Sequence, residues 1–534
     1  MTDQRTLQQR LIHTLEQPQV YPHPVEKVEH IETHISTVLL AGDFAYKIKK
    51  PLDLGFLNFT QLERRRFYCE EELRLNRRLA PQIYDDLVAF SGSPEDPIFN
   101  GPDTPFEYAV RMKRFDTSLM LDRLQSEGHL PIERMEDLAR RVATFHERIA
   151  VAPPESDYGE PDKVLHPMQQ NVDQIRQRLG DTDRLAQLDR VEAWTLAQFE
   201  ALRPLLLERK QRGFIRECHG DMHLGNMALV DDEPMLFDGI EFNPFMRWID
   251  IISEVAFLTM DLKDRGASAH ANRFLNIWLE HTGDYRGLRL LDFYQVYRAM
   301  VRAKVAVIRL GQDALAEDER DELTQECHTY LDLAEHFTQS RGKALFINHG
   351  FSGSGKTTLS QPLMEAIEAI RVRSDVERKR MAGIRPTERR SNGTHQGLYS
   401  PDLTERTYGR LGELATEVLE AGYPVIVDAT FLKTAQRARF ADLARTRGLP
   451  FRVLDYRADP EQLRAHIAER TQAGDDASDA DMSVVNHQLD SHEPLLPAEP
   501  VITIDTSAPL PLQQVQAALG STAHDPGSSG DPGG

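Results

Sequence analysis

The chain has 534 residues, 40% of them hydrophobic and 28% charged, which is the balance of a globular protein rather than of a disordered or membrane protein. A formal net charge of -21 argues against a nucleic-acid-binding or membrane-surface protein, and three widely spaced cysteines argue against a disulfide framework. No apolar signal region or membrane-spanning run is evident, so we expect a cytoplasmic protein, and its length predicts at least two domains.

The first part of the chain is predicted to be rich in β-strands. Two runs with many β-branched and aromatic residues, 28–36 and 37–50, indicate an antiparallel hairpin of two strands. A charged helix with one apolar face is expected over residues 62–79, and another strand over residues 106–115. Residues 1–24 are expected to form a helical extension before this strand-rich part.

Long amphipathic helices are predicted in the middle of the chain. Helical periodicity covers residues 132–212, apart from the proline-containing segment 152–167, and returns over residues 248–337. Between these regions we expect two short strands, at 227–230 and 235–238. A first domain is therefore expected over residues 25–340, with its boundary near Ser340.

Strands and helices alternate in the last third of the chain. The expected strands are 343–349, 370–373, 424–428, 451–456 and 500–504. Such alternation is typical of a parallel α/β sheet, and we expect this second domain over residues 341–520. Residues 521–534 contain too few apolar side chains to pack and are expected to form a disordered tail.

A phosphate-binding motif opens this second domain. The segment from Gly350 to Thr357 matches the pattern G-x-x-x-x-G-K-[ST] and lies between a strand and a helix, as its chemistry requires. Its glycines let backbone N–H groups surround phosphates, Lys356 supplies a charge to the β and γ oxygens, and the Thr357 hydroxyl is a ligand for Mg2+. The predicted ATP-binding residues here are Gly350, Gly353, Ser354, Gly355, Lys356, Thr357 and Thr358.

Two carboxylates follow expected strands of the same domain. Asp375 comes at the carboxyl end of a strand, where open α/β sheets bind ligands, and is our candidate to accept a proton from a substrate hydroxyl. An N-cap for the following helix is the alternative role of Asp375. Asp428 ends another strand and is a candidate Mg2+ ligand, with a turn-forming carboxylate as the alternative.

An arginine-bearing segment lies further on. Arg464 and Arg470 precede the polar segment 473–481, which resembles a mobile lid, and Arg470 is our candidate to neutralise the transferring phosphoryl group. Exposed salt bridges are the alternative for both arginines. The domain resembles the small P-loop kinases related to gluconate kinase, polynucleotide kinase and zeta-toxin-like enzymes. That resemblance implies phosphoryl transfer to a hydroxyl, with Asp375 and Arg378 facing the acceptor.

A second constellation lies in the first domain. His219-Gly220-Asp221-Met222-His223-Leu224-Gly225-Asn226 is followed twelve residues later by Asp238. In kinase chemistry such a first aspartate accepts the hydroxyl proton, while the asparagine and the second aspartate hold Mg2+. These roles fall on Asp221, Asn226 and Asp238.

This loop resembles that of the aminoglycoside phosphotransferase family, whose H-G-D-x-H-x-x-N pattern it matches at every position. The resemblance covers residues 25–335 and implies an α+β bilobal protein-kinase-like fold, followed here by the α/β P-loop domain. It also implies a strand lysine that contacts phosphates and pairs with a helix glutamate. Lys47 fits best, with Lys49 as a rival, and the glutamate is Glu72, with Glu71 as a rival.

Three details of the resemblance remain to be placed. A glycine-rich loop is missing, so any phosphate cover would come from Thr33 and Ser36. His219 and His223 have the spacing of a zinc pair, but the glycines between and beside them favour a loop in which His219 acts as a hydrogen-bonding brace. Asp250 is expected to tie the loop to the helical region.

We therefore predict an ATP- and Mg2+-dependent phosphotransferase with two nucleotide sites that acts on small-molecule hydroxyl groups. One alternative is a nucleotide-dependent switch protein whose kinase-like part only holds a ligand. The other is a nucleic-acid end kinase, which would need a basic groove near Arg378, Lys379 and Arg380. No motif identifies the acceptor substrates.

Overall fold

The chain divides into two compact units. The structure is a computed structural model and describes residues 4–55, 57–311, 315–385, 400–457, 488–505 and 508–519. The first unit combines residues 1–171 with 199–265, and the second combines 172–198 with 266–534. The domain limits expected from the sequence, 1–24, 25–340, 341–520 and 521–534, concern independent folding and stay predictions.

A six-stranded antiparallel sheet forms the beginning of the first unit, in the order β1-β2-β3-β6-β4-β5. Its strands are β1 (Val28–Glu32), β2 (Ser36–Ala41), β3 (Phe44–Lys49), β4 (Tyr84–Ser93), β5 (Asp96–Phe99) and β6 (Glu107–Lys113). Helix α1 (Gln4–Leu15) shares a hydrophobic core with β2 and β3, and α2 (Leu62–Asn76) shares another with β4 and β6. The strands expected at 28–36 and 106–115 and the helix at 62–79 are present with shorter bounds.

The single strand expected over residues 37–50 is wrong. The chain forms two strands there, β2 and β3, and pairs Ala41 with Phe44 across a two-residue turn. Gly42 adopts a φ of 57°, a left-handed conformation that side-chain-bearing residues rarely adopt. The turn residues Gly42 and Asp43 lie inside a hydrophobic run, so the run was interpreted as one strand. Glycine and aspartate are both frequent in turns, so the sequence did contain a signal for this hairpin.

The remaining elements of the first unit are mostly helical. They include α3 (Leu121–Ser126), α4 (Arg134–Arg148), β7 (Ile215–Glu217), β8 (Met227–Val230), β9 (Glu233–Leu236), α7 (Pro244–Arg247), β10 (Trp248–Asp250) and α8 (Ile251–Asp264). Helices α5 (Pro161–Arg176) and α6 (Thr182–Gln211) follow. The interruption expected over residues 152–167 is too long, because α5 begins at Pro161 and contains Pro167. Strands β8 and β9 form a hairpin that leads from Asn226 to Asp238.

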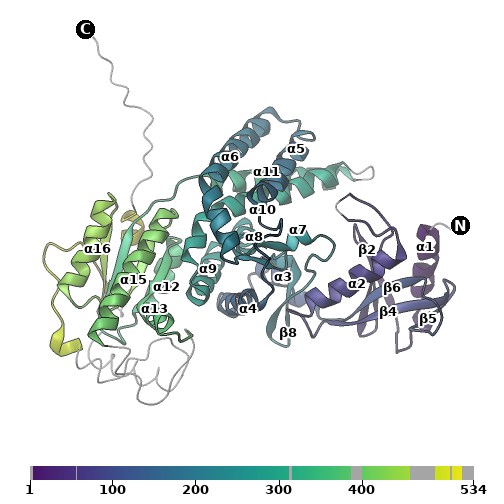
Figure 1. Cartoon of the computed structure of the whole chain (residues 1–534), viewed down its shortest axis with the longest axis horizontal. Coiled ribbons are helices and arrows are strands. Elements are labelled where there is room, and N and C mark those ends of the chain that lie inside the picture. The colour runs from purple at the N-terminus through teal and green to yellow at the C-terminus, as the bar shows by residue number, and fades with distance from the viewer. Residues whose placement is uncertain are drawn as a thin grey trace, which may run out of the picture. The chain divides into compact units, whose positions relative to one another are not determined.

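The second unit contains a parallel sheet of five strands in the order β12-β13-β11-β14-β15. The strands are β11 (Leu345–His349), β12 (Ile370–Arg373), β13 (Val425–Asp428), β14 (Phe451–Arg457) and β15 (Val501–Asp505). Its helices within the described residues include α9 (Ser268–Thr282), α10 (Leu288–Leu310), α11 (Glu317–Phe337), α12 (Lys356–Ala366), α13 (Ser374–Met381), α15 (Pro401–Glu420), α16 (Thr434–Thr446) and α19 (Leu512–Ala517) (Figure 1). The five strands predicted from the sequence are confirmed within one or two residues.

Helices cover both faces of this parallel sheet. Phe346, Ile426 and Leu454 point to one face and form a core with Leu363 of α12 and Val515 of α19. The intervening strand residues point the other way, where α15 contacts β13 and α16 contacts β11 and β14. Strands that are buried on both faces explain the near-continuous apolar runs in the sequence. The predicted α/β fold of the second domain is confirmed by this parallel sheet, and the first unit has the predicted strand-rich region followed by helices.

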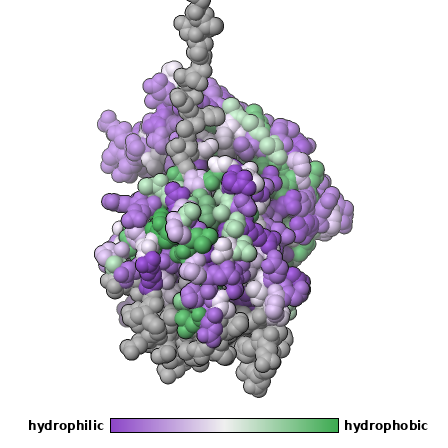
Figure 2. Space-filling view, turned by 90° about the vertical axis from the view of Figure 1, so that its left-hand side faces the viewer, coloured by the Kyte–Doolittle hydropathy of each residue, from purple (hydrophilic) through white to green (hydrophobic). Residues whose placement is uncertain are grey.

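Among the described helices, none is long and apolar enough to span a membrane. Hydrophilic residues surround smaller hydrophobic areas on the face shown in Figure 2. Large apolar side chains that are exposed are scattered along the described chain rather than gathered in one segment.

Candidate functional site

Lys47 brings together residues that are far apart in the sequence. It lies on β3, between β2 and β6, and its side chain is 11% exposed. Its Nζ atom lies 2.9 Å from Glu72 Oε1 and 2.5 Å from Asp238 Oδ1, although Asp238 is 191 residues away. The structure therefore places the lysine, the helix glutamate and the second aspartate of the predicted kinase-like site in one cluster.

The rival lysine, Lys49, has a different environment. Its side chain is fully buried, lies 2.6 Å from Glu72 Oε2 and also pairs with Glu241. Lys47 is therefore the lysine that contacts Asp238, whereas Lys49 neutralises the buried carboxylates of Glu72 and Glu241. The rival glutamate, Glu71, pairs with Arg74 instead, so Glu72 is the residue placed between the two lysines.

The two lysines govern the protonation of Glu72. Burial alone would raise the pKa of this carboxyl group, but the ammonium groups of Lys47 and Lys49 outweigh burial and lower the pKa to about 2. Burial would lower the pKa of Lys47, but Asp238 and Glu72 hold it well above its usual value. Lys47, Lys49 and Glu72 are therefore all charged at neutral pH, and the Lys47 ammonium group is a fixed cation beside Asp238.

Asp221 lies on a loop held by hydrogen bonds at several points. The Asn226 side chain donates to Asp221 Oδ2 at 2.9 Å and to the Asp221 carbonyl at 3.0 Å. Buried carboxylates of α8 accept backbone N–H groups of the same loop: Glu254 accepts from Gly220, and Asp261 accepts from Leu224. Helix α8 thus fixes the loop from below, while the Asp221 side chain stays 37% exposed.

The loop lies next to the segment that carries Asp238. The Phe237 N–H donates to the Asn226 carbonyl, and the Ile240 N–H donates to the His219 carbonyl, each at 3.0 Å. Asp238 itself has a φ of 61° and a half-exposed side chain. Asp221, Asn226 and Asp238 therefore belong to two adjoining segments. Oxygen donors from Asn226 and Asp238 are of the kind that Mg2+ prefers, so the residues fit this ion.

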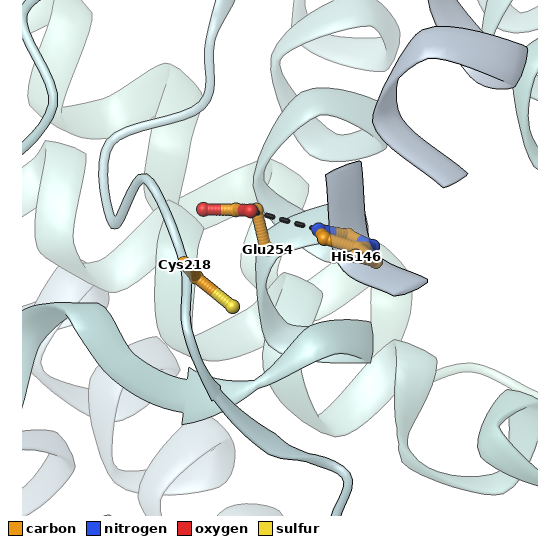
Figure 3. Close-up of side chains that lie close together, drawn as sticks. All are labelled: His146, Cys218 and Glu254. Atoms are coloured by element: carbon orange, nitrogen blue, oxygen red, sulfur yellow. Dashed lines mark hydrogen bonds and ion pairs between the residues drawn. The ribbon is translucent and has the colours of Figure 1, made fainter. Parts of the chain in front are cut away.

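His146, Cys218 and Glu254 form a fully buried cluster beneath this loop (Figure 3). His146 Nε2 lies 2.8 Å from Glu254 Oε2, and the Cys218 thiol donates to the Ile249 carbonyl at 3.7 Å. Burial raises the pKa of Cys218 well above its usual value, which disfavours the thiolate that a metal would need. The cluster therefore braces the loop through hydrogen bonds.

The two motif histidines make local contacts instead of a zinc pair. His219 Nε2 lies 2.9 Å from the Phe237 carbonyl, and His223 Nε2 lies 3.4 Å from Asp221 Oδ2. Burial lowers the pKa of His219, which keeps its ring neutral. Asp250 accepts two hydrogen bonds from Arg209 of α6 and caps α8, and its expected tie to the loop stays a prediction. Thr33 Oγ1 and the Ser36 backbone bond each other at the β1–β2 turn.

The segment 350–357 forms a tight phosphate-binding loop between β11 and α12. Gly350 and Gly355 have φ angles of 149° and 75°, and a Cβ atom at Gly350 would lie 2.8 Å from Ser354 Oγ. Lys356 Nζ donates to the carbonyls of Gly350 and Phe351 at 3.0 and 2.6 Å. Gly353 also has a positive φ, of 86°, and Thr358 is exposed on α12.

Asp428 is tied to this loop by its carboxylate. Thr357 Oγ1 donates to Asp428 Oδ2 at 2.9 Å, and the Asn348 side chain donates to Asp428 Oδ1 at 3.0 Å. Arg373 Nε lies 3.9 Å from Asp428 Oδ2. A hydroxyl and a carboxylate that share one position beside the loop make a donor set that fits Mg2+.

Asp375 lies inside α13 rather than at its cap. Arg373 occupies the N-cap position, so the alternative role of Asp375 as an N-cap is wrong, and Asp375 pairs with Arg378 at 3.1 Å. Arg380 pairs with Glu377, and Lys379 is buried, so these cations do not form an exposed basic groove. Arg464, Arg470 and the segment 473–481 lie outside the described residues.

Comparisons with known proteins agree with this organisation. Residues 345–495 match the AAA domain family, which confirms the expected P-loop domain. The uncharacterized protein Rv2004c of Mycobacterium tuberculosis (strain ATCC 25618 / H37Rv) is 30% identical over 423 residues, covering 78% of this chain and 81% of that protein. The chain belongs to the same family as this mycobacterial protein.

Two solved structures resemble separate parts of the chain. A gluconokinase from Sinorhizobium meliloti 1021 is 22% identical, covers 34% of this chain and 91% of its own, and has a TM-score of 0.24. A choline kinase from Cryptosporidium parvum Iowa II is 11% identical, covers 62% of this chain and 96% of its own, and has a TM-score of 0.39.

Sequence reasoning missed several residues of these sites. Glu241, which pairs with Lys49, lies three positions after Asp238, and a second carboxylate so close to a predicted Mg2+ ligand was an available signal. Arg371 and Arg373 alternate on β12, where inward charges on a buried strand signal a partner elsewhere. That partner, Glu280, lies 91 residues before Arg371 and has no recognisable motif.

Proposed function

We propose that the protein is an ATP-dependent phosphotransferase with two nucleotide sites, each of which transfers the γ-phosphoryl group to a hydroxyl of a small molecule. The observation that carries the proposal is the contact of Lys47 with both Glu72 and Asp238. A buried lysine held beside a half-exposed carboxylate, next to a second loop carboxylate, is an arrangement that serves phosphoryl transfer.

In the kinase-like site the roles follow from position. Lys47 would bind phosphate oxygens, and Glu72 holds its ammonium group in place. Asp221 accepts the proton of the attacking hydroxyl, because it is exposed and is oriented by Asn226. Asn226 and Asp238 would hold Mg2+, which when bound neutralises charge on the phosphates.

In the P-loop site, backbone N–H groups of residues 350–357 bind the phosphates and Lys356 turns from its own loop carbonyls towards them. Thr357 and Asp428 would hold Mg2+. Asp375 takes the proton from the hydroxyl group of the acceptor molecule. Its partner Arg378 orients the Asp375 carboxylate. Arg470 would neutralise the transferring group.

The test is a screen of small hydroxyl compounds with consumption of ATP as the readout, run on the full chain and on two single-site variants. Asp221→Asn should abolish transfer to one set of acceptors, and Lys356→Ala should abolish transfer to another. Thermal unfolding of each variant serves as the control for folding. If every acceptor-dependent turnover survives in both variants, the proposal is wrong.

A further inference from the structure

Strand β12 is an edge strand whose outer side is covered by a helix. It pairs with β13 on one side only, which would leave backbone groups without partners on the other side. Asn272 and Asn276 of α9 donate to the Ala369 carbonyl at 3.0 and 3.1 Å, and Asn276 Oδ1 accepts the Arg371 N–H at 2.7 Å. Both asparagines are buried, so α9 takes the place of a neighbouring strand.

One turn after Asn276, a buried glutamate binds two arginines of this strand. Glu280 Oε1 accepts from Arg371 Nε and Nη2 at 3.1 and 2.9 Å, and Glu280 Oε2 accepts from Arg373 Nη1 at 3.4 Å. Glu280 is 6% exposed and Arg371 is 3% exposed. Charge-assisted hydrogen bonds between such buried side chains are stronger than hydrogen bonds between neutral groups.

Both arginines also reach the phosphate-binding loop. Arg371 Nη1 donates to the Thr357 carbonyl at 3.1 Å. Arg373 Nε lies 3.9 Å from the Asp428 carboxylate, which itself accepts the Thr357 hydroxyl. Glu280 therefore connects to Thr357 through Arg371 and to Asp428 through Arg373, and these are the two residues that would hold Mg2+.

We propose that Glu280 is a positioning residue of the P-loop nucleotide site: it holds Arg373 3.9 Å from the Asp428 carboxylate, short of a hydrogen bond, and Arg371 on the Thr357 carbonyl, so that Asp428 and Thr357 stay available to Mg2+. The inference rests on the proposed nucleotide site at residues 350–357. Without Glu280, the Arg373 guanidinium loses a compensating anion, and its long ion pair with Asp428 can tighten into a hydrogen bond. It then competes with Mg2+ for that carboxylate.

The experiment measures ADP binding to the full chain by calorimetry while Mg2+ is titrated, and assigns to the P-loop site the binding that is lost in Lys356→Ala. In Glu280→Gln, half-maximal binding at this site should need about tenfold more Mg2+. Binding of ADP without Mg2+ should change far less. In the double variant E280Q/R373Q the Mg2+ requirement should return to about the wild-type value, because the competing cation is gone.

The matched control is Glu365→Gln. Glu365 of α12 pairs with Arg273 of α9 at 2.7 Å and is similarly shielded, but this pair does not contact Thr357 or Asp428. Its Mg2+ requirement should match the wild type. If thermal unfolding shows that Glu280→Gln does not fold, Glu280→Asp replaces it. The shorter side chain keeps the negative charge but moves it away from the two arginines, so the Mg2+ needed for half-maximal binding should rise about threefold.

The outcomes separate the inference from the proposal beneath it. An unchanged Mg2+ requirement in the folded Glu280 variant, with binding still lost in Lys356→Ala, overturns the role of Glu280 alone. An equal shift in Glu365→Gln, or no return in E280Q/R373Q, also overturns it. If Lys356→Ala leaves ADP binding intact, the P-loop site and the inference fall together.

Discussion

The two lysines at the proposed phosphate sites contact different chemical groups. Lys47 contacts the carboxylates of Glu72 and Asp238, whereas Lys356 donates to carbonyls of its own loop. Phosphates arriving at Lys356 would compete with neutral acceptors five and six residues away, among others. Phosphates arriving at Lys47 compete with a charged residue. On the proposed function, the P-loop would bind its anion with residues close together in sequence, and a metal bound at the kinase-like site would draw Asp238 away from its lysine.

The largest expected effect tests whether the two aspartates of the kinase-like site differ in kind. Asp221→Asn should leave nucleotide affinity nearly intact but reduce transfer by about a thousandfold, because a general base acts mainly in the transition state. Asp238→Asn should raise the Mg2+ needed for nucleotide binding. Turnover and calorimetric binding of both variants provide the measurement. Equal losses of affinity in the two variants would contradict separate roles.

Next in size is the effect of removing the cation of the P-loop. Lys356→Ala should weaken ATP binding at its site by about a hundredfold, since the loop loses a fixed positive charge near the β and γ phosphates. The exposed Arg445 of α16 in the same unit offers a control, because its partner Asp442 lies on the same helix. Arg445→Ala should bind ATP normally. Wild-type affinity in Lys356→Ala would remove the contrast between the two sites.

A third variant tests whether Lys49 is structural. Lys49→Met leaves Glu72 and Glu241 buried with one cation fewer and should lower the free energy of unfolding by about 3–5 kcal/mol. The control is the neighbouring Lys50, which is 28% exposed and pairs with the exposed Glu32. Lys50→Met should lower the free energy of unfolding by about 1 kcal/mol or less. Chemical denaturation gives both values. A large loss of nucleotide affinity in folded Lys49→Met would instead make Lys49 the phosphate-binding lysine.

The smallest expected effect is a dependence on pH. The pKa of Glu72 is lowered from 4.5 to about 2, so its ionisation stabilises the folded state fully above pH 4.5. That contribution shrinks as the pH falls from 4.5 towards 2, at no more than about 1.4 kcal/mol per pH unit. The difference in unfolding free energy between the wild type and Glu72→Gln should therefore be constant above this window and fall within it. A constant difference throughout would mean that Glu72 is not held ionised by its lysines.

The same contrast explains what the sequence could predict. The P-loop residues are contiguous, so pattern and local geometry identified them together with both flanking elements. The kinase-like site draws Lys47, Glu72 and Asp238 from three distant elements, and only the fold decides between Lys47 and Lys49. Both lysines lie on the same face of β3, so periodicity alone could not separate them. Glu280 was beyond prediction because its role depends on which helix covers a sheet edge.

The cover over β12 also sets an order of events during synthesis. Asn276 leaves the ribosome 93 residues before Ala369, the backbone group it will bond. Helix α9 is therefore synthesised before the strand whose edge it covers, so it can fold before that strand emerges. A circular permutant that starts between α11 and β11 would reverse this order, and would release the bare edge of β12 to other chains until α9 arrived.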